Sequence, residues 1–535
     1  MCSISVQSQD IKATEVRVTE GFKPSVPEAN KLNEQASFAD TLKVDKSQIY
    51  SVNQYNLKTN FKTRPLKAAK VKDESISKLY NNKAAIGFGD NWNKRFSFSH
   101  NSNRSKDLNY GVLLRHISNQ YKPTGFEARN SKNTLHLFAK KITSSHIFIA
   151  NLGYDRRTAL YFDMSSKEEE KYFRNRFAFS KISMTAINKN NSKSLIKKVN
   201  FFLSDFNEMS ENQLHLSADL EKEINSMPIN IEIEFNNFLN YNNKDSRYES
   251  LDLKELHFVP QASFNKIGIN FQAGLNFHYD PYGVAVSPLL NASKELVKDI
   301  LLISGGIRHK EERHTLKAIS DVNPYMHSYG SNQAIFSGYS FLQELKSTAG
   351  EELFFSMRNK LGANEVFEGS IAYGQFTDFA NFLGLDNGDY NRFVVDYLDL
   401  KQLQISLDYK RVLNDVISVD AQADYFNWNE EVYYKPNLTI AVSAPINLRD
   451  KIQAVPSINY IGSRMAQFEN MLLNELVIRT ELPAQFHANL MLQYNYSKIL
   501  SAYLQLNNLT NSQEVLFKGY QEIGFNGVFG VNYSF

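Results

Sequence analysis

The residues that decide the fold are the last of the chain, Phe525 to Phe535, which read F-N-G-V-F-G-V-N-Y-S-F. Small or polar residues hold the even positions, such as Asn526, Gly530 and Asn532. Alternate side chains of a β-strand point to opposite faces of its sheet. The stretch therefore predicts a closing strand with one polar face and one apolar face, the latter formed by Phe525, Phe529, Val531, Tyr533 and Phe535.

The same alternation recurs throughout the chain from Ala84 onward, and its longest run is Ile267 to Tyr279. A run of this length exceeds the roughly five or six residues of an ordinary strand. It suits a tilted strand that crosses a membrane, which needs roughly nine to eleven residues. Similar runs predict further strands, and one of them, Ile417–Tyr425, is predicted to pair with Leu438–Ala444.

A chain crosses hydrocarbon as strands only if the sheet closes, because the backbone groups of an open edge would lack hydrogen-bond partners there. The sequence therefore predicts an all-β fold, one transmembrane antiparallel barrel. About 450 residues at roughly 28 for each strand and connection predict about 16 strands, within a range of 14–18. The alternative is a large soluble β protein such as a propeller, but the sequence shows no repeat of blade length.

Composition limits the other possibilities. The net charge is +3 and the mean hydropathy is −0.41, so nothing in the composition indicates a nucleic-acid partner. The longest apolar runs are too short for a membrane-spanning helix. Cys2 is the one cysteine, which excludes an intrachain disulfide framework and any metal site built from several cysteines.

The chain before the barrel divides into two parts. Residues 1–9, M-C-S-I-S-V-Q-S-Q, are interpreted as the remnant of a signal peptide whose basic and apolar regions are missing. The alternative of a lipid on Cys2 lacks a preceding signal. Residues 10–83 predict an irregular periplasmic arm, with a basic run at Lys62–Lys72 that either docks on a partner or is a solvated surface. The barrel is predicted over residues 84–535.

Several stretches of the second half of the chain resemble the barrels of TonB-dependent receptors from Gram-negative bacteria. They are Gly306–Tyr325, Tyr460–Arg464, Leu500–Asn511 and the closing strand. The resemblance implies an outer-membrane location with a periplasmic N-terminus. It also implies that Phe529, Val531, Tyr533 and Phe535 form the C-terminal signal read by the barrel assembly machinery during insertion.

The sequence also departs from that family. A receptor of this kind carries a plug of on the order of 150 residues and a short segment that pairs with the TonB protein by β-augmentation. Only about 75 residues precede the predicted barrel here, and they contain no glycine-rich strands of a plug. The resemblance therefore implies a plugless, receptor-like barrel, and energised import is not carried over.

The densest group of ionisable residues is Arg308–His314. On a strand, His309, Glu311 and Arg313 share one face, and Glu312 and His314 share the other. Neither face supplies three metal ligands, and the interleaved basic residues repel a cation. The segment predicts salt-bridged rim residues, so neither a metal site nor a bound cofactor is predicted.

Two further sets of residues are candidate sites. Arg156 and Arg157 are predicted to contact the lumen or an anion such as the phosphate of lipopolysaccharide. Aromatic residues near predicted strand ends are expected at the membrane boundary, where amphipathic rings settle: Phe88, Trp92, Trp428, Tyr433 and Tyr434. A barrel lipase would need a catalytic triad, but no spacing singles out Ser99, His100 or His116, so we predict no catalytic residue and no enzyme.

Two functions follow from the sequence. In the first, the barrel is a subunit of a larger outer-membrane complex for assembly, secretion or surface display, and this is the favoured hypothesis because the arm is long for a porin. In the second, it is a plugless receptor-like pore for passive or partner-gated solute passage. The expected partners are outer-membrane lipid, lipopolysaccharide, the assembly machinery, and outer-membrane or periplasmic proteins bound through the arm.

Overall fold

The computed structural model describes residues 79–535 apart from 103–104, 123–127, 161–173, 190–193, 208–209, 226, 241–252, 282, 327–345, 363, 387–390, 471–475 and 514. Residues 1–9 and the arm up to residue 78 lie outside the described residues. The first strand, β1 (Asn82–Gly89), begins close to the predicted start of the barrel.

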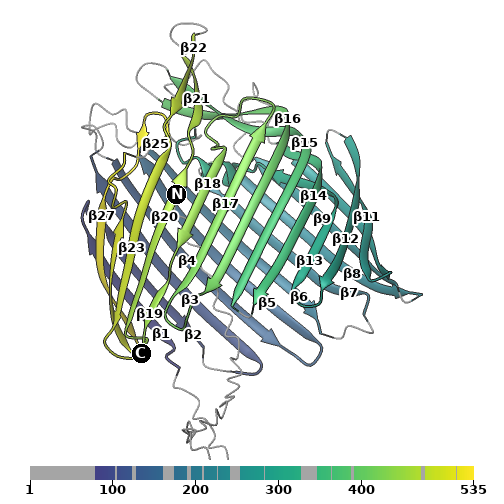
Figure 1. Ribbon diagram of the computed structural model, residues 1–535, viewed down its shortest axis with the longest axis horizontal. Coiled ribbons are helices and arrows are strands. Elements are labelled where there is room, and N and C mark those ends of the chain that lie inside the picture. Colours follow the sequence, from purple (N-terminus) through teal and green to yellow (C-terminus); the bar gives the residue numbers. More distant parts are fainter. Residues whose placement is uncertain are drawn as a thin grey trace, which may run out of the picture. The chain divides into compact units, whose positions relative to one another are not determined.

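The described chain forms one closed antiparallel barrel (Figure 1). Each strand pairs with the strands before and after it along the ring, and β1 closes the ring by pairing with β27 (Asn526–Ser534). The other strands of the ring are β2 (Lys94–Asn101), β3 (Leu108–Tyr121), β4 (Ala128–Ile142), β5 (His146–Leu160), β6 (Arg174–Asn188), β7 (Ile196–Phe206), β8 (Glu211–Ile224), β9 (Met227–Asn240), β10 (Leu253–Lys266), β11 (Ile269–Asp280), β12 (Gly283–Val297), β13 (Leu301–Arg313), β14 (Ser347–Gly362), β15 (Glu365–Asp386), β16 (Asn391–Val412), β17 (Ser418–Trp428), β18 (Leu438–Ser443), β19 (Ile446–Leu448), β20 (Ile452–Ile461), β23 (Gln485–Asn495) and β24 (Leu500–Asn507).

The ring contains 22 strands, because β18 and β19 both pair with β20 and share one place. The prediction of about 16 strands is therefore wrong. The roughly 28 residues allowed for each strand and its connection are too many. Some consecutive strands are separated by only two residues: 225–226, 267–268 and 363–364. The alternation also runs unbroken through tight turns: Ile267 and Gly268 form a turn with φ of +56° and +69°, although the sequence places both in a strand.

Two further hairpins lie outside the ring. They are β21 (Arg464–Asn470) with β22 (Leu476–Leu482), and β25 (Val515–Phe517) with β26 (Tyr520–Gln521). The β21 strand pairs in parallel with the end of β15. Both hairpins belong to connections at one end of the barrel, which we call the loop end (Figure 1).

The connections differ between the two ends. The loop end carries the long ones: 314–346, 429–437, 462–484 and 508–525. The opposite end, the turn end, carries tight turns such as 267–268 and 449–451. The C-terminus lies at the turn end, where Asn82 and Phe535 exchange two backbone hydrogen bonds of 3.0 Å. Tight turns at one end and long loops at the other are the arrangement of outer-membrane barrels.

The closing strand shows how the two faces of the barrel differ. Phe529, Val531, Tyr533 and Phe535 are exposed on the outside, whereas Val528 is fully buried on the other face. Exposed apolar side chains recur on many other strands of the ring. An apolar outer band around a polar interior is what a lipid-facing barrel requires.

One helix lies among the described residues, α1 (Leu316–Val322), within the connection between β13 and β14. Its N-cap is Thr315, whose side chain accepts a hydrogen bond from the backbone N–H of Ala318 at 3.0 Å. In the described part of the chain, no helix has the length and the apolar character to cross a membrane.

Candidate functional site at the loop end of the barrel

The loop-end connections pack together in one cluster of buried, mostly aromatic side chains, which we call the mouth cluster. It joins opposite walls of the barrel, because it contains residues of β3, β4 and β5 on one side and of β15 and β16 on the other. Between these walls it includes side chains of the long connections. Its members include Tyr121, Ala159, Tyr325, Phe393, Phe468 and Tyr520.

Residues 314–326, which we call the mouth segment, run from β13 to the wall formed by β5, β6 and β8. The guanidinium of Arg157 donates to the carbonyl of Ser320 and lies 3.8 Å from the carboxylate of Asp321. The amide of Asn175 donates to the carbonyl oxygens of residues 324 and 326, at 2.9 and 2.8 Å. Because Asn175 is fully buried, these bonds satisfy groups that water does not reach.

The start of α1 is held by β8. The carboxylate of Glu211, which is 4% exposed, accepts hydrogen bonds from the backbone N–H groups of Leu316 at 2.8 Å and Lys317 at 3.3 Å. The first N–H groups of a helix have no partner within the helix, and a carboxylate satisfies them well. Glu211 therefore fixes the point at which the mouth segment turns into α1.

The end of the mouth segment reaches the opposite wall. Tyr325 stacks on Tyr520 of β26, and Met326 forms an isolated parallel bridge with Phe393 of β16. The ring of Phe393 also packs on Phe517 with centroids 5.2 Å apart. The mouth segment thus connects the β5–β8 wall with β16 and with the β25–β26 hairpin, across the mouth of the barrel.

Two ionisable groups are buried beside this segment. Burial lowers the pKa of His314 to about 4. Burial also lowers the pKa of Lys435 to about 8, and its ammonium lies 3.8 Å from the centre of the Phe379 ring. The Nε2 of His314 lies 2.5 Å from the hydroxyl of Thr348, which donates its own hydrogen to the carbonyl of Asp378. His314 must therefore donate from Nε2, which identifies its neutral tautomer.

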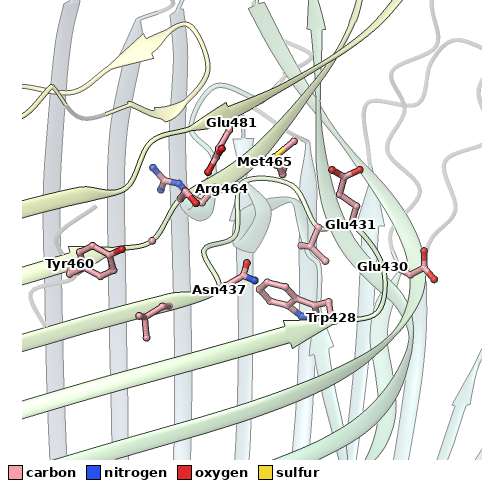
Figure 2. A pocket seen from close by; sticks show the side chains of 12 residues that line it. Trp428, Glu430, Glu431, Asn437, Tyr460, Arg464, Met465 and Glu481 are labelled. Carbon is pink, nitrogen blue, oxygen red and sulfur yellow. The ribbon is translucent and has the colours of Figure 1, made fainter.

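A pocket of about 440 Å³ lies at the loop end, between the end of β17 and the start of β21 (Figure 2). Arg464 and Glu481 lie close together on one side of it, with Trp428 and Asn437 on another. The guanidinium of Arg464 donates to the carbonyl of Val515 at 3.0 Å, which links the pocket to the β25–β26 hairpin. An aromatic wall with both charges suits a polar solute that carries groups of either sign.

A second, basic pocket of about 600 Å³ lies on the outer face near the loop end. Arg129, Arg156 and Arg176 come from the neighbouring strands β4, β5 and β6, and Lys94 and Trp92 complete one side. Their strands place them on the same face as outward-pointing Leu152 and Tyr154. We call this set the outer basic pocket.

The structure separates residues that the sequence groups together. Arg156 points outward, while Arg157 points inward and holds the mouth segment. Phe88 and Trp92 are 64% and 70% exposed on the outside. Tyr433 and Tyr434 are instead buried in the mouth cluster, away from the outer surface where the strand-end pattern predicts them.

Trp428 is also drawn inward: it lines the loop-end pocket and donates to the side-chain oxygen of Gln402 at 2.9 Å. An aromatic residue near a strand end has the same sequence pattern whether a loop covers its ring or the ring faces lipid.

The segment Arg308–His314 forms ion pairs, as predicted, with Arg308 bonded to Glu352 and Arg313 bonded to Glu234 at 2.8 Å.

Comparison with solved structures places the fold. The siderophore receptor PirA from Acinetobacter baumannii matches with a TM-score of 0.61 and 11% identity, over 86% of this chain and 81% of that chain. The ferric enterobactin receptor of Pseudomonas aeruginosa matches with a TM-score of 0.60 and 12% identity, over 85% and 81%. The fold is that of the siderophore receptors.

FpvA of Pseudomonas aeruginosa, solved with heterologous pyoverdines, has the same receptor fold at a TM-score of 0.59 and 10% identity, over 85% of this chain and 72% of that chain. Comparison with models of protein families and with curated proteins finds no match. The resemblance to TonB-dependent receptors drawn from the sequence is thus confirmed for the barrel.

Proposed function

We propose that the protein is a non-enzymatic outer-membrane barrel that passes solutes through its lumen and is gated at its loop end. The receptor fold, the apolar outer face and the unequal lengths of the connections at the two ends support this location and role. They favour the pore hypothesis over the complex-subunit hypothesis, because the structural neighbours are a ferric enterobactin receptor and a siderophore receptor.

The observation that carries the proposal is the mouth segment. A ring of 22 strands encloses a lumen wide enough to need a plug or cover, unlike a ring of eight strands, which side chains fill. Here, residues 314–326 cross the mouth and are held by buried hydrogen bonds to β5, β6 and β8. Passage of a solute would require this segment to move, so we infer that a ligand or partner displaces it. A plugless lumen and a periplasmic N-terminus belong to the same proposal.

The outer basic pocket supports the membrane location independently. Guanidinium groups bind phosphate with paired hydrogen bonds, and lipopolysaccharide presents phosphates at the outer leaflet. Three arginines on adjacent strands, facing outward near the loop end, form such a site. We infer that lipopolysaccharide is the lipid partner of this face.

Conductance in planar bilayers tests the proposal. The wild-type barrel should conduct poorly, and a variant that lacks residues 316–322, bridged by a short glycine-serine linker, should conduct well. A matched variant with the same linker in place of 449–451 at the turn end should behave as wild type. Equal conductance of all three barrels would refute gating by the mouth segment, and stoichiometric co-purification of another protein would restore the complex-subunit hypothesis.

A further inference from the structure

Three adjacent or nearly adjacent strands bring two imidazoles and a carboxylate together close to the loop end of the barrel. They are His257 of β10, His278 of β11 and Glu311 of β13, and their ligand atoms all lie within 4.8 Å of one another. His257 and His278 are direct cross-strand partners, with ring centroids 4.3 Å apart. His257 and Glu311 line a cavity of about 400 Å³ close to the loop end. The strand β13 ends near this cavity at Arg313, where the mouth segment begins.

Two of the three distances within this group are close to those of ligands around an ion. Oε2 of Glu311 lies 3.5 Å from Nε2 of His257 and 3.5 Å from Nδ1 of His278. A hydrogen bond between these atoms would bring them to roughly 2.7–3.2 Å. Tetrahedral zinc, with bonds of about 2.0–2.1 Å, holds neighbouring ligand atoms about 3.3 Å apart.

A third imidazole, of His309, lies behind the same oxygen. Its Nε2 is 3.7 Å from Oε2 of Glu311, and its side chain is 9% exposed. Both ring nitrogens of His309 are buried without a hydrogen-bond partner. Buried polar atoms in a folded protein almost always have a partner. The unpartnered imidazole of His309 beside Oε2 of Glu311 therefore indicates a ligand that it shares with this carboxylate.

The net charge around the group is negative and therefore favours a divalent cation. Arg313 is paired with three carboxylates: Glu234 at 2.8 Å, Glu311 at 3.4 Å, and Glu255. One guanidinium among three carboxylates leaves two negative charges at the edge of the cavity. Glu311 faces Arg313 with Oε1 and faces the imidazoles with Oε2, so its two oxygens have separate partners.

Neighbouring groups hold the imidazoles in the form that a metal needs. Arg313 Nη2 lies 2.9 Å from Nε2 of His257, and a guanidinium only donates, so this nitrogen is unprotonated and carries a lone pair. The carboxylate of Asp280 lies 3.4 Å from Nε2 of His278, on the far side of the ring from Glu311. A carboxylate behind a ligating imidazole fixes its orientation and raises its basicity.

We propose that His257, His278 and Glu311 form a binding site for a divalent transition-metal ion of the zinc class. These three residues supply three protein ligands, and His309 is the side chain best placed to supply the fourth. The ion takes the place of one hydrogen bond from Arg313 to His257, and Arg313 keeps its contacts with Glu234 and Glu255. The ion would tie β13 to β10 and β11 directly below the mouth segment.

Calorimetric titration of the full-length, tag-free barrel in detergent with Zn²⁺, after treatment with a chelator, tests the site. The wild type should bind one equivalent, and His278→Ala and Glu311→Gln should each weaken binding at least tenfold. Co²⁺ in place of Zn²⁺ should give the visible absorption of a tetrahedral site in the wild type, which Glu311→Gln abolishes. If His309 is the fourth ligand, His309→Ala should change the Co²⁺ spectrum.

The matched control is His136→Ala, which removes a histidine that belongs to no group of three candidate ligands among the described residues. It should bind Zn²⁺ as the wild type does. Heat-modifiable mobility in gel electrophoresis shows that each variant is a folded barrel. The proposal is overturned if the wild type takes up no stoichiometric Zn²⁺, or if folded His278→Ala and Glu311→Gln barrels bind as tightly as His136→Ala. The outcome does not depend on solute passage.

Discussion

Tyr325 and Tyr520 stack face to face, with ring centroids 3.6 Å apart and an angle of 14° between the rings. One belongs to the mouth segment and the other to β26, the hairpin before the closing strand. Both side chains are almost fully buried. The pair therefore joins two loop-end connections that are far apart in sequence.

Replacing Tyr520 with alanine should loosen the mouth cluster without disturbing the ring of strands. Truncating a buried aromatic side chain costs about 3–5 kcal/mol in a packed core, and this loss falls on the loop end. We expect faster proteolysis within residues 314–326 and larger single-channel conductance in planar bilayers. Tyr496→Ala, in an exposed turn at the opposite end, is the control and should change neither. Unaltered conductance of Tyr520→Ala would separate this cluster from gating.

A second prediction concerns the seam that closes the barrel, where β27 pairs with β1 and β24. Tyr503 of β24 lies across glycines of β27 and β1, and a Cβ added to Gly87 would meet the Tyr503 hydroxyl at 2.3 Å. Gly87→Ala should therefore destabilise the barrel by about 1–3 kcal/mol, as overpacking does. In Gly87→Ala/Tyr503→Phe the nearest remaining atom is at 3.3 Å, so most of the loss should return.

Urea unfolding of the folded barrel, followed by loss of heat-modifiable mobility, measures this effect. Gly153→Ala is the matched control, because its added Cβ would find the nearest atom only at 3.9 Å. A Tyr503→Phe substitution that fails to recover Gly87→Ala would show that the backbone of the seam, rather than the tyrosine, excludes a side chain there.

The sequence predicts the strands well because alternation is a local property. The pairing of Ile417–Tyr425 with Leu438–Ala444 is confirmed, with Tyr425 opposite Leu438 and Ala423 opposite Ile440. The strand count fails where alternation continues through a turn, as at Ile267. A two-residue turn leaves the alternation of apolar and polar residues unchanged, because its length equals the period of the pattern. Such a turn therefore cannot be recognised from the alternation alone.

The candidate sites could not be predicted from local patterns in the same way. Glu311 and its strand offer too few ligands, and the two histidines that join it come from β10 and β11 through strand register. Register becomes known only when every strand and turn is placed. The mouth cluster likewise unites residues from β3 to β26, and nothing in the sequence near Tyr433 or Tyr434 indicates that they are covered.

The neutral state of His314 predicts a dependence on pH. Burial lowers its pKa to about 4, whereas an unfolded histidine has a pKa of about 6.5. The open or unfolded state therefore binds more protons between these values, so stability is fully present above about pH 6.5 and is lost as the pH falls toward 4. Glu312 and Asp378 favour protonation of His314 and Lys435 opposes it, but burial outweighs them.

We expect the mouth segment to exchange its backbone hydrogens faster as the pH falls through this window, after correction for intrinsic exchange. His314→Gln keeps a donor for Thr348 but does not titrate, so it should remove this dependence. Residues of β4, which do not contact His314, provide the internal reference. A wild-type mouth segment equally protected at both ends of the window would contradict the prediction.

The outer basic pocket makes the last prediction, which concerns the membrane itself. Arg129, Arg156 and Arg176 face outward from adjacent strands near the loop end, and each offers a planar pair of donors to phosphate. The double variant Arg129→Ala/Arg156→Ala should lose lipopolysaccharide several-fold during purification in mild detergent, measured as bound phosphate and lipid-A fatty acid. The barrel should remain folded, because these side chains line an open surface pocket rather than the core.

Arg115→Ala is the matched control. Arg115 follows outward-facing Leu114 on β3, so its side chain points to the opposite face, and its replacement should leave the lipid content unchanged. Equal retention of lipopolysaccharide by the double variant and the wild type would mean that the pocket does not hold this lipid.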